Sequence, residues 1–415
     1  MYAVCSICTA YRQHRLSGTM HVYMGNGDAA NKVTTIGITD WRETRIVFGI
    51  KQQDRFAHML VIGKTGVGKS TLLFNMAISD IANGSGIGVV DPHGDLAERI
   101  MGALSEQQRK EVIYFNAAQP NGHTVFNPLK DVAPEQYHLA AAEIISTFKK
   151  VWGDSWGPRL EYILRYSLLT LLYYPAATLL DIQRLLTDDK FRTEILSFVT
   201  DGYIQAFWYN EYDKYPPTLR HEAIASILNK TGSFIANKTL RDIVGKQKTI
   251  SLGSIINEKK IFIANLSKGT VGEEACSLLG SMLITGIQLA AFRRTGIPEC
   301  DRVPFFLFID EAPSFATSTF VPFLSEVRKY KVGLFLAHQY LGQFDKEIQS
   351  ALFGNVGTLI CFQAGIEDAE KLAKELYPVF SAADVVGLPR FSMYIKLMID
   401  GVVSRPFSSI LKGQV

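Results

Sequence analysis

One stretch decides the fold of this chain: Gly63-Lys64-Thr65-Gly66-Val67-Gly68-Lys69-Ser70, which has the pattern G-x-x-x-x-G-K-S. It follows the apolar run 59–62, which predicts a buried strand, and it precedes the run 71–77, which predicts a helix. A strand, a glycine-rich loop and a helix are the context in which this pattern holds phosphate. The alternative is a glycine-rich turn that binds nothing, and the lysine and serine at its end argue against it. The sequence therefore predicts a nucleotide-binding protein.

Each part of this loop has a predicted task. The glycines let backbone N–H groups close around phosphates, Lys69 places a charge at the β- and γ-phosphates, and Ser70 supplies a hydroxyl for Mg²⁺. The predicted nucleotide-binding residues are Gly63, Lys64, Thr65, Gly66, Val67, Gly68, Lys69, Ser70 and Thr71.

The composition describes a globular chain with a large core. Its 415 residues predict two domains, or one domain with a large insertion. A net charge of +3 neither requires nor excludes nucleic acid as a partner. The odd count of five cysteines argues against a disulfide framework and fits a reducing compartment. Cys5 and Cys8 form a C-x-x-C pair, for which a metal site and a frayed terminal tail are the two interpretations.

The sequence predicts neither a secretory signal nor a transmembrane segment. The first residues carry positive charges but no apolar core of a signal peptide. The stretch 275–292 has no charged residue, but it contains several polar and glycine residues between two predicted strands. We expect it to be a buried helix of the core and not a membrane span.

Apolar runs that alternate with helical segments predict an α/β fold with a mostly parallel sheet. Residues 1–44 are expected to be irregular, 45–151 to form the first part of the core, and 249–415 to form its second part. Residues 152–248 show helical spacing and no strand, and we expect an all-α insertion domain there. This insertion has 12 Lys and Arg residues against 11 Asp and Glu residues, so it is not a basic patch.

The strand predicted at 305–309 ends in two acids, Asp310 and Glu311, in the form of a Walker B motif. Asp310 is predicted to hold Mg²⁺, and Glu311 to orient and deprotonate the attacking water. Gln339, at the end of the next strand, is a candidate contact of the γ-phosphate or of the water. Arg328 is a candidate arginine finger for a neighbouring subunit. The plain alternatives are an exposed acidic turn, an edge amide and a solvated helix end.

The order of these motifs resembles the HerA/FtsK superfamily of DNA-pumping ATPases. Within it, the chain looks most like the coupling proteins of type IV secretion, the conjugative DNA transfer class. The segments that carry this resemblance are 63–70, 90–95, 156–162, 265–274, 308–312 and 336–340. It extends over roughly residues 45–410.

The resemblance implies a RecA-like core, a hexameric ring with DNA in its central pore, and ATP with Mg²⁺ as cofactors. It also implies a relaxase or secretion-channel proteins as partners, and a cytoplasmic location, at the inner face of the membrane or free of it. Lys69, Ser70, Asp310, Glu311, Gln339 and Arg328 carry over in the roles given above. Typical coupling proteins have membrane helices at their N-terminus, and none is predicted here, which favours a soluble relative or one recruited by a partner.

Two other functions stay open. A secretion or assembly ATPase that acts on protein fits the nearly neutral insertion, and a soluble HerA-like repair helicase would act with a nuclease. The aromatic run Phe207-Trp208-Tyr209, with Tyr212 and Tyr215, is a candidate for base stacking, although a core or an interface explains it better. The pairs Arg293-Arg294 and Lys329-Lys331 are candidates for phosphate contact or for solvated helix ends.

Overall fold

The computed structural model describes residues 32–40, 45–119 and 124–413. The chain divides into two compact units, residues 1–84 with 333–415 (unit 1) and residues 85–332 (unit 2). Cys5 and Cys8, with the metal site considered for them, lie outside the described residues. Within the described ranges, no group of three or more His, Cys, Asp or Glu side chains is placed to hold a metal ion.

Unit 1 is built on a sheet that is parallel at one side and antiparallel at the other. Its strand order is β2 (Val47–Lys51), β1 (Val33–Thr39), β13 (Phe407–Leu411), β10 (Ser392–Lys396), β9 (Thr358–Cys361), β3 (Met59–Ile62) and β8 (Val332–His338). β3 runs parallel to both β9 and β8, and the remaining pairs are antiparallel. Every residue of β3 is buried, as expected of a central parallel strand.

Strand β1 lies in the segment that was expected to be irregular, so that expectation was wrong for residues 33–39. Its sequence, VTTIGIT, offers little apolar alternation beyond Ile36, and its pairing partners are distant in the chain. It pairs with β2 on one side and with β13 on the other. Buried Thr34 donates a hydrogen bond of 2.7 Å to Asp80, which also forms an ion pair with buried Arg55.

The helices of unit 1 are α2 (Lys69–Ala82), α16 (Lys346–Asn355), α17 (Ile366–Glu375) and α18 (Ala382–Val386). A short hairpin near the end of the chain pairs β11 (Met398–Ile399) with β12 (Val402–Val403). Asp400 and Gly401 form its turn with φ values of 51° and 78°, which are typical of a tight hairpin turn. The backbone N–H groups of both residues donate to the carboxylate of Asp54.

Unit 2 contains a parallel sheet with the order β7 (Phe305–Ile309), β4 (Gly86–Asp91), β6 (Ile261–Asn265) and β5 (Val112–Asn116). Its flanking helices include α3 (Asp95–Ala103), α4 (Glu106–Glu111), α12 (Leu252–Asn257) and α14 (Glu273–Phe292). Because the strands are parallel, their carboxyl ends lie at one edge. This edge carries Asp91, Asn265 and Asp310, so unit 2 gathers its polar strand ends there.

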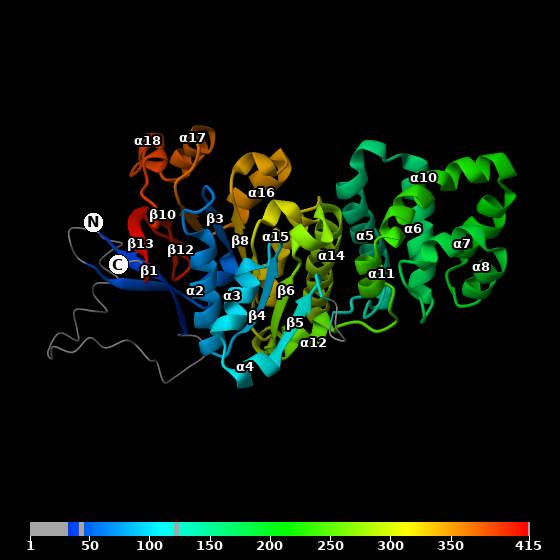
Figure 1. Ribbon diagram of the computed structural model, residues 1–415, viewed down its shortest axis with the longest axis horizontal. Coiled ribbons are helices and arrows are strands. Elements are labelled where there is room, and N and C mark those ends of the chain that lie inside the picture. Colours follow the sequence, from blue (N-terminus) through cyan, green and yellow to red (C-terminus); the bar gives the residue numbers. More distant parts are fainter. Residues whose placement is uncertain (1–31, 41–44, 120–123, 414–415) are drawn as a thin grey trace. The chain divides into compact units, whose positions relative to one another are not determined.

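Helix α14 contains the uncharged stretch 275–292. With the turn that follows it, it is the one helix among the described residues that is long and apolar enough to cross a membrane. Of its apolar window, 83% is buried inside the protein. It packs along α5 (Tyr137–Trp152) and against α12 (Figure 1). This burial agrees with the predicted core helix.

The residues described between β5 and β6 contain helices and no strand. After α5 come α6 (Pro158–Tyr173), α7 (Asp181–Thr187), α8 (Asp189–Leu196), α9 (Gly202–Ala206), α10 (Pro217–Ala236) and α11 (Lys238–Val244). Figure 1 shows α6, α7, α8 and α10 grouped together in green. The helical content expected for 152–248 is therefore present. That these residues act as a separate domain remains a prediction.

Candidate functional site

The phosphate loop of unit 1 is held at both sides by backbone hydrogen bonds. It joins β3 to α2, and α2 begins at Lys69. The N–H of Lys64 donates to the carbonyl of Gln363 at 2.9 Å, after β9, and the N–H of Gly63 donates to the carbonyl of His338 at 3.3 Å, in β8. These contacts fix the start of the loop against two neighbouring strands.

Gly68 shows why the loop requires glycine. Its φ is 123°, and a Cβ at this position would lie 2.7 Å from Leu411 and 2.9 Å from Phe391. The N–H of Phe391 in turn donates to the carbonyl of Val67 at 2.9 Å. The loop therefore packs against the β10–β13 side of the sheet. It is followed directly by the N-terminus of α2, a helix of 14 residues. Such a terminus favours phosphate.

Lys69 is folded back into its own loop. Its ammonium donates to the carbonyls of Gly63 at 2.6 Å and Lys64 at 2.8 Å, and the residue is 7% exposed. A buried ammonium that is satisfied by carbonyls is ready to exchange them for phosphate oxygens, which are the stronger partners. Ser70, the predicted Mg²⁺ ligand, is exposed in the first turn of α2.

The structure places Gln339 beside this loop. Ile62 of β3 is in register with His338 of β8. The residues that follow them, Gly63 and Gln339, therefore lie at the same edge of the sheet. The hydroxyl of Thr65 donates a hydrogen bond of 3.2 Å to the side-chain carbonyl of Gln339. Burial lowers the pKa of His338 to about 4, so this ring is neutral at pH 7. The position of Gln339 suits the predicted contact with phosphate or water, and its role remains a prediction.

The acid pair of unit 2 ends a strand that is buried throughout. Asp310 and Glu311 are 8% and 9% exposed. The N–H of Asp310 donates to Val90 of β4 at 3.0 Å, and the N–H of Glu311 donates to the carboxylate of Asp310 at 3.1 Å. Glu311 has a φ of 52°, a left-handed conformation that costs a residue with a side chain about 1–3 kcal/mol. Backbone strain of this kind concentrates at functional positions.

Asp91, at the end of β4, holds the turn that leads into α3. The N-cap of α3 is Gly94, with a φ of 96°. The carboxylate of buried Asp91 accepts hydrogen bonds from the N–H groups of His93 and Ala97, both at 2.9 Å. Asn265, at the end of β6, donates to the hydroxyl of Tyr114 at 3.0 Å. The aspartate thus fixes the turn between β4 and α3.

Arg328 is exposed in the 3-10 turn Val327–Tyr330, and its side chain makes no hydrogen bond or ion pair with any described residue. Its role as an arginine finger remains a prediction. Arg294, a candidate for phosphate contact or for a solvated helix end, has neither environment. Arg294 is fully buried and donates to Asn257 at 2.9 Å and to the carbonyls of Val303 at 2.8 Å and Tyr330 at 2.7 Å. It is therefore a structural residue, and the suggestion of phosphate contact was wrong for it.

The aromatic run of the helical segment is mostly core. Trp208 and Tyr212 are fully buried, and Phe207 is 3% exposed. The indole N–H of Trp208 donates to Thr170 at 2.8 Å, and the hydroxyl of Tyr212 donates to the carbonyl of Leu186 at 2.9 Å. These contacts confirm the core interpretation.

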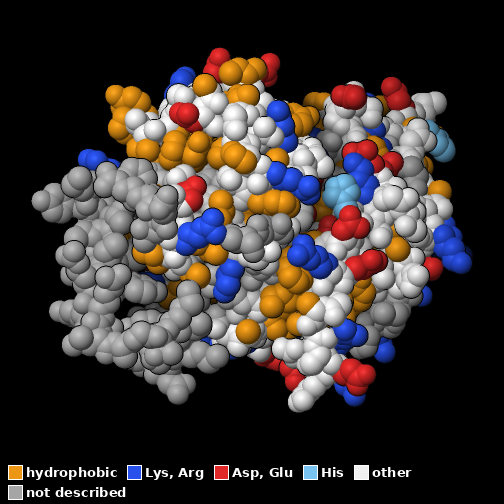
Figure 2. Space-filling model, turned by 60° about the vertical axis from the view of Figure 1, so that its left-hand side comes forward, with side chains coloured by type: hydrophobic (Ala, Val, Ile, Leu, Met, Phe, Trp, Pro, Cys, Tyr) orange, Lys and Arg blue, Asp and Glu red, His pale blue; other side chains and the backbone are white. Residues whose placement is uncertain are grey.

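On the face drawn in Figure 2, Lys and Arg side chains are scattered between hydrophobic and acidic ones.

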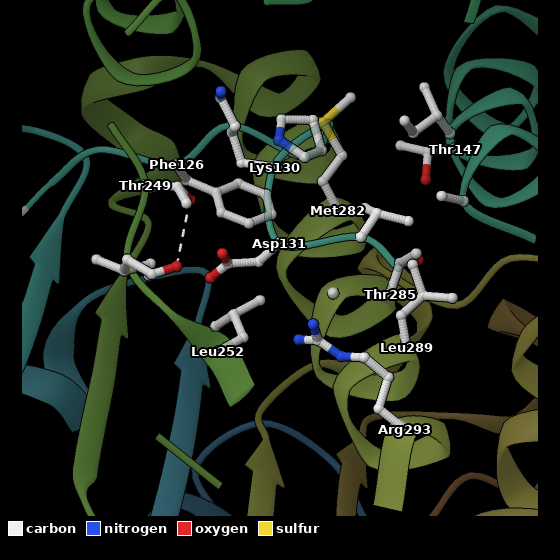
Figure 3. Close-up of a pocket in the computed structure, with 16 residues that line it drawn as sticks. Phe126, Lys130, Asp131, Thr147, Thr249, Leu252, Met282, Thr285, Leu289 and Arg293 are labelled. Carbon is white, nitrogen blue, oxygen red and sulfur yellow. Dashed lines mark hydrogen bonds between the residues drawn. The ribbon is translucent and has the colours of Figure 1, made fainter. Parts of the chain in front are cut away.

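Unit 2 also contains a small cavity, which is not a nucleotide site. It is lined by residues 126–132 and by helices α5, α12 and α14. Figure 3 shows Asp131 and Arg293 among the side chains that line it. Its volume of about 30 Å³ is that of one or two water molecules. An open surface depression beside it shares Asp131 and Arg293.

Sequence reasoning missed a buried carboxyl group near this cavity. Glu143 of α5 accepts hydrogen bonds from Thr285 at 3.3 Å and Gln288 at 3.2 Å, both on α14, and from Thr319. Burial raises the pKa of Glu143 to about 7, and these hydrogen bonds oppose the shift. No local pattern marks this residue, because its partners lie far away in the chain.

Glu143→Gln should remove a pH dependence of stability. The pKa of Glu143 is raised in the folded state, so its proton is held there between about pH 4.5 and 7 and is lost on unfolding. Stability must therefore fall as the pH rises through this window. The glutamine has no charge to bury, its amide oxygen can accept from Gln288, and its NH2 can donate to the threonine hydroxyls, so we expect it to gain roughly 1–3 kcal/mol at pH 8 and almost nothing at pH 4. Urea unfolding at the two pH values measures this difference, and Glu135→Gln, at an exposed site, is the control. An equal change at both pH values would contradict it.

Comparisons with known proteins agree with this architecture. A family model described as "Type IV secretory system Conjugative DNA transfer" matches residues 28–153. A comparison with curated protein sequences gave no match. The conjugative coupling protein TrwB, in its unbound form, is 17% identical, with a TM-score of 0.65, over 88% of this chain and 87% of that one. Its complex with ADP and Mg²⁺ gives the same values.

VirB4 of Thermoanaerobacter pseudethanolicus is also similar. It is 15% identical, with a TM-score of 0.59, over 93% of this chain and 97% of that one. At these identities the likeness shows the fold. The comparisons confirm the predicted α/β fold with a RecA-like P-loop core, and they confirm the resemblance to the coupling-type ATPases of type IV secretion.

Proposed function

We propose that this chain is an ATP-driven motor that moves DNA during type IV secretion or conjugation. The observation that carries the proposal is that one chain contains both a phosphate loop, with Gln339 beside it in unit 1, and a buried strand that leads into Asp310 and Glu311 in unit 2. TrwB, which has the same fold, is described in complexes with ADP and Mg²⁺ and with analogues of ATP and GTP. We assign ATP and Mg²⁺ to this chain on that basis.

The residues fit this cofactor pair. Lys69, held by carbonyls that phosphate oxygens can replace, would bind the β- and γ-phosphates. Ser70, with its exposed hydroxyl, and Asp310 would be the ligands of Mg²⁺, which neutralises charge on the phosphates when bound. The loop N–H groups and the N-terminus of α2 add further donors for the phosphates.

Hydrolysis needs a base and an oriented water. Glu311 would take the proton of a water molecule as the water oxygen attacks the γ-phosphorus and the bond to ADP breaks. Gln339, next to the phosphate loop, would orient this water. Arg328 would stabilise the transition state of a neighbouring subunit, which implies a ring, and we propose a hexamer around DNA. The motor would act in the cytoplasm, at the inner face of the membrane or free of it, with a relaxase or channel proteins as partners.

One other class of substrate is favoured by a specific observation. The helical segment 152–248 has nearly balanced charge, and most of its aromatic run is buried. A surface of this kind suits a protein as well as DNA, so a secretion or assembly ATPase that acts on protein is the second candidate. A HerA-like repair helicase would instead require a nuclease partner.

DNA should stimulate ATP hydrolysis by the purified protein. We expect linear double- or single-stranded DNA to raise the steady-state rate several-fold, because a motor hydrolyses ATP productively only when it is engaged with its track. Lys69→Ala, which removes the phosphate-binding ammonium, should abolish both the basal and the stimulated rate. Hydrolysis that ignores every form of DNA would overturn the DNA motor and favour the protein-directed ATPase. A protein that does not hydrolyse ATP at all would overturn both.

A further inference from the structure

The backbone that follows Glu311 is held by side chains from two helices. The acid pair is followed by the short 3-10 turn Ala312–Ser314. The segment 313–319 begins in this turn and continues to α15 (Phe320–Glu326). Four consecutive carbonyls in this segment accept hydrogen bonds from side chains. Ser277 and Ser281 of α14 donate to Ser314 and Phe315, each at 2.9 Å.

Lys150 of α5 holds the other two carbonyls. Its ammonium donates to Pro313 and to Ala316, both at 2.6 Å, so one side chain spans both ends of the run. A charged donor makes stronger hydrogen bonds than a neutral one. The next part of the segment is also tied to α5, because the hydroxyls of Ser146 and Ser318 lie 3.0 Å apart, and Glu143 accepts a hydrogen bond from Thr319.

The packing of the same segment leaves little freedom. Phe315 is 2% exposed, and its ring lies against Gly280 of α14. A Cβ at Gly280 would lie 2.2 Å from the ring, so only glycine admits this approach. The N–H of Ser314 donates to the carbonyl of Glu311 at 2.9 Å. The backbone of this segment is therefore bonded directly to Glu311. Glu311 has a left-handed backbone conformation, which persists only when the surrounding structure holds it.

Helix α5 continues from this contact into the helical segment. It ends at Trp152, whose indole N–H donates to Glu274 of α14 at 3.0 Å, and α6 begins at Pro158. α5 also packs against α6. A displacement of these helices must therefore pull on Lys150, which lies half-buried two residues before the end of α5.

We propose that Lys150 is a positioning residue for Glu311, and that it couples hydrolysis to the state of the helical segment. By fixing the carbonyls of Pro313 and Ala316, it sets the backbone that presents the carboxylate to water. A substrate that shifts α5 would change this geometry, and a misplacement of about 1 Å at a catalytic group can change a rate by about 100-fold. The proposal rests on the proposed role of Glu311 as the base.

The test compares three variants of the full chain. Lys150→Met removes the two donor bonds and keeps the length of the side chain, Lys150→Arg keeps donors, and Lys149→Met changes the exposed neighbour. We expect Lys150→Met to lower kcat by about 10- to 100-fold, and more in the presence of DNA than without it. The affinity for a fluorescent ADP analogue should not change. Lys150→Arg should recover most of the rate, and Lys149→Met should match the unmodified protein.

Hydrogen exchange gives a readout that does not depend on hydrolysis. Peptides that cover 311–319 should exchange faster in Lys150→Met, and peptides that cover the phosphate loop should not. Unchanged exchange in 311–319, or a kcat within two-fold of the unmodified protein, would overturn the positioning role. An equal fall in the basal and DNA-stimulated rates would overturn the coupling. If the unmodified protein proves inactive, the proposed function fails, and faster exchange would still show that Lys150 holds this segment.

Discussion

Glu311→Gln should lower kcat for ATP hydrolysis by at least about 100-fold and leave nucleotide binding intact. Glutamine has nearly the same shape and can hold a water molecule, but it cannot accept the proton. General-base catalysis contributes about 10²- to 10⁴-fold in rate, so its loss should be a large effect that leaves the binding of nucleotide unchanged. Both side chains bear the same backbone strain at a φ of 52°, and the fold should not change. Steady-state hydrolysis and titration with a fluorescent ATP analogue measure the two quantities.

The control for this substitution is Glu347→Gln, an exposed glutamate on α16 that carries no assigned role. It should hydrolyse ATP at the unmodified rate. Lys69→Ala offers a second comparison, because it should lose affinity for the nucleotide as well as activity. If Glu311→Gln keeps more than about a tenth of the rate, Glu311 is not the base, because that loss is smaller than general-base catalysis supplies.

The elements that the sequence predicted well have strong local signals. The strands at 59–62 and 305–309 were placed at their observed bounds, because continuous apolar runs between turn residues are typical of buried parallel strands. The loop between β3 and α2 was recognised from its spacing, and the place of Gln339 beside it follows from its position after an apolar strand, while the roles of these residues remain predictions.

The elements that were missed depend on distant partners. β1 is a threonine-rich strand whose place is fixed by β2 and β13, and nothing in its own pattern indicates burial. Arg294 was considered for phosphate contact or as a solvated helix end, because the carbonyl groups that hold it are scattered in the sequence. Lys150 meets its two carbonyl partners more than 160 positions away, so no spacing rule could reveal it. Sequence patterns predict what a residue type can do, and packing decides where it does it.

Trp208→Ala should unfold or loosen the helical segment, with a loss of about 3–5 kcal/mol of stability. Trp208 is fully buried, and its ring centroid lies 5.0 Å from that of Phe207 and 4.8 Å from that of Tyr212. The guanidinium of buried Arg192 lies 5.7 Å from the indole ring. Alanine would leave a cavity that rigid helices cannot fill, and the lost volume dominates the effect. The hydroxyl of Thr170 keeps a second partner, the carbonyl of Tyr166 at 2.7 Å.

Tyr209→Ala is the matched control, because Tyr209 follows in the chain and is 50% exposed. A half-exposed side chain should cost less than about 1 kcal/mol when it is truncated. Hydrogen exchange in α6, α8 and α10 measures the effect locally, which suits a chain with two compact units better than one global transition does. If the helical segment engages the substrate, Trp208→Ala should abolish stimulation by DNA while basal hydrolysis persists. If α6, α8 and α10 exchange in Trp208→Ala as slowly as in the unmodified protein, Trp208 does not hold these helices together. If the helices exchange faster but DNA still stimulates hydrolysis, the substrate contacts another surface.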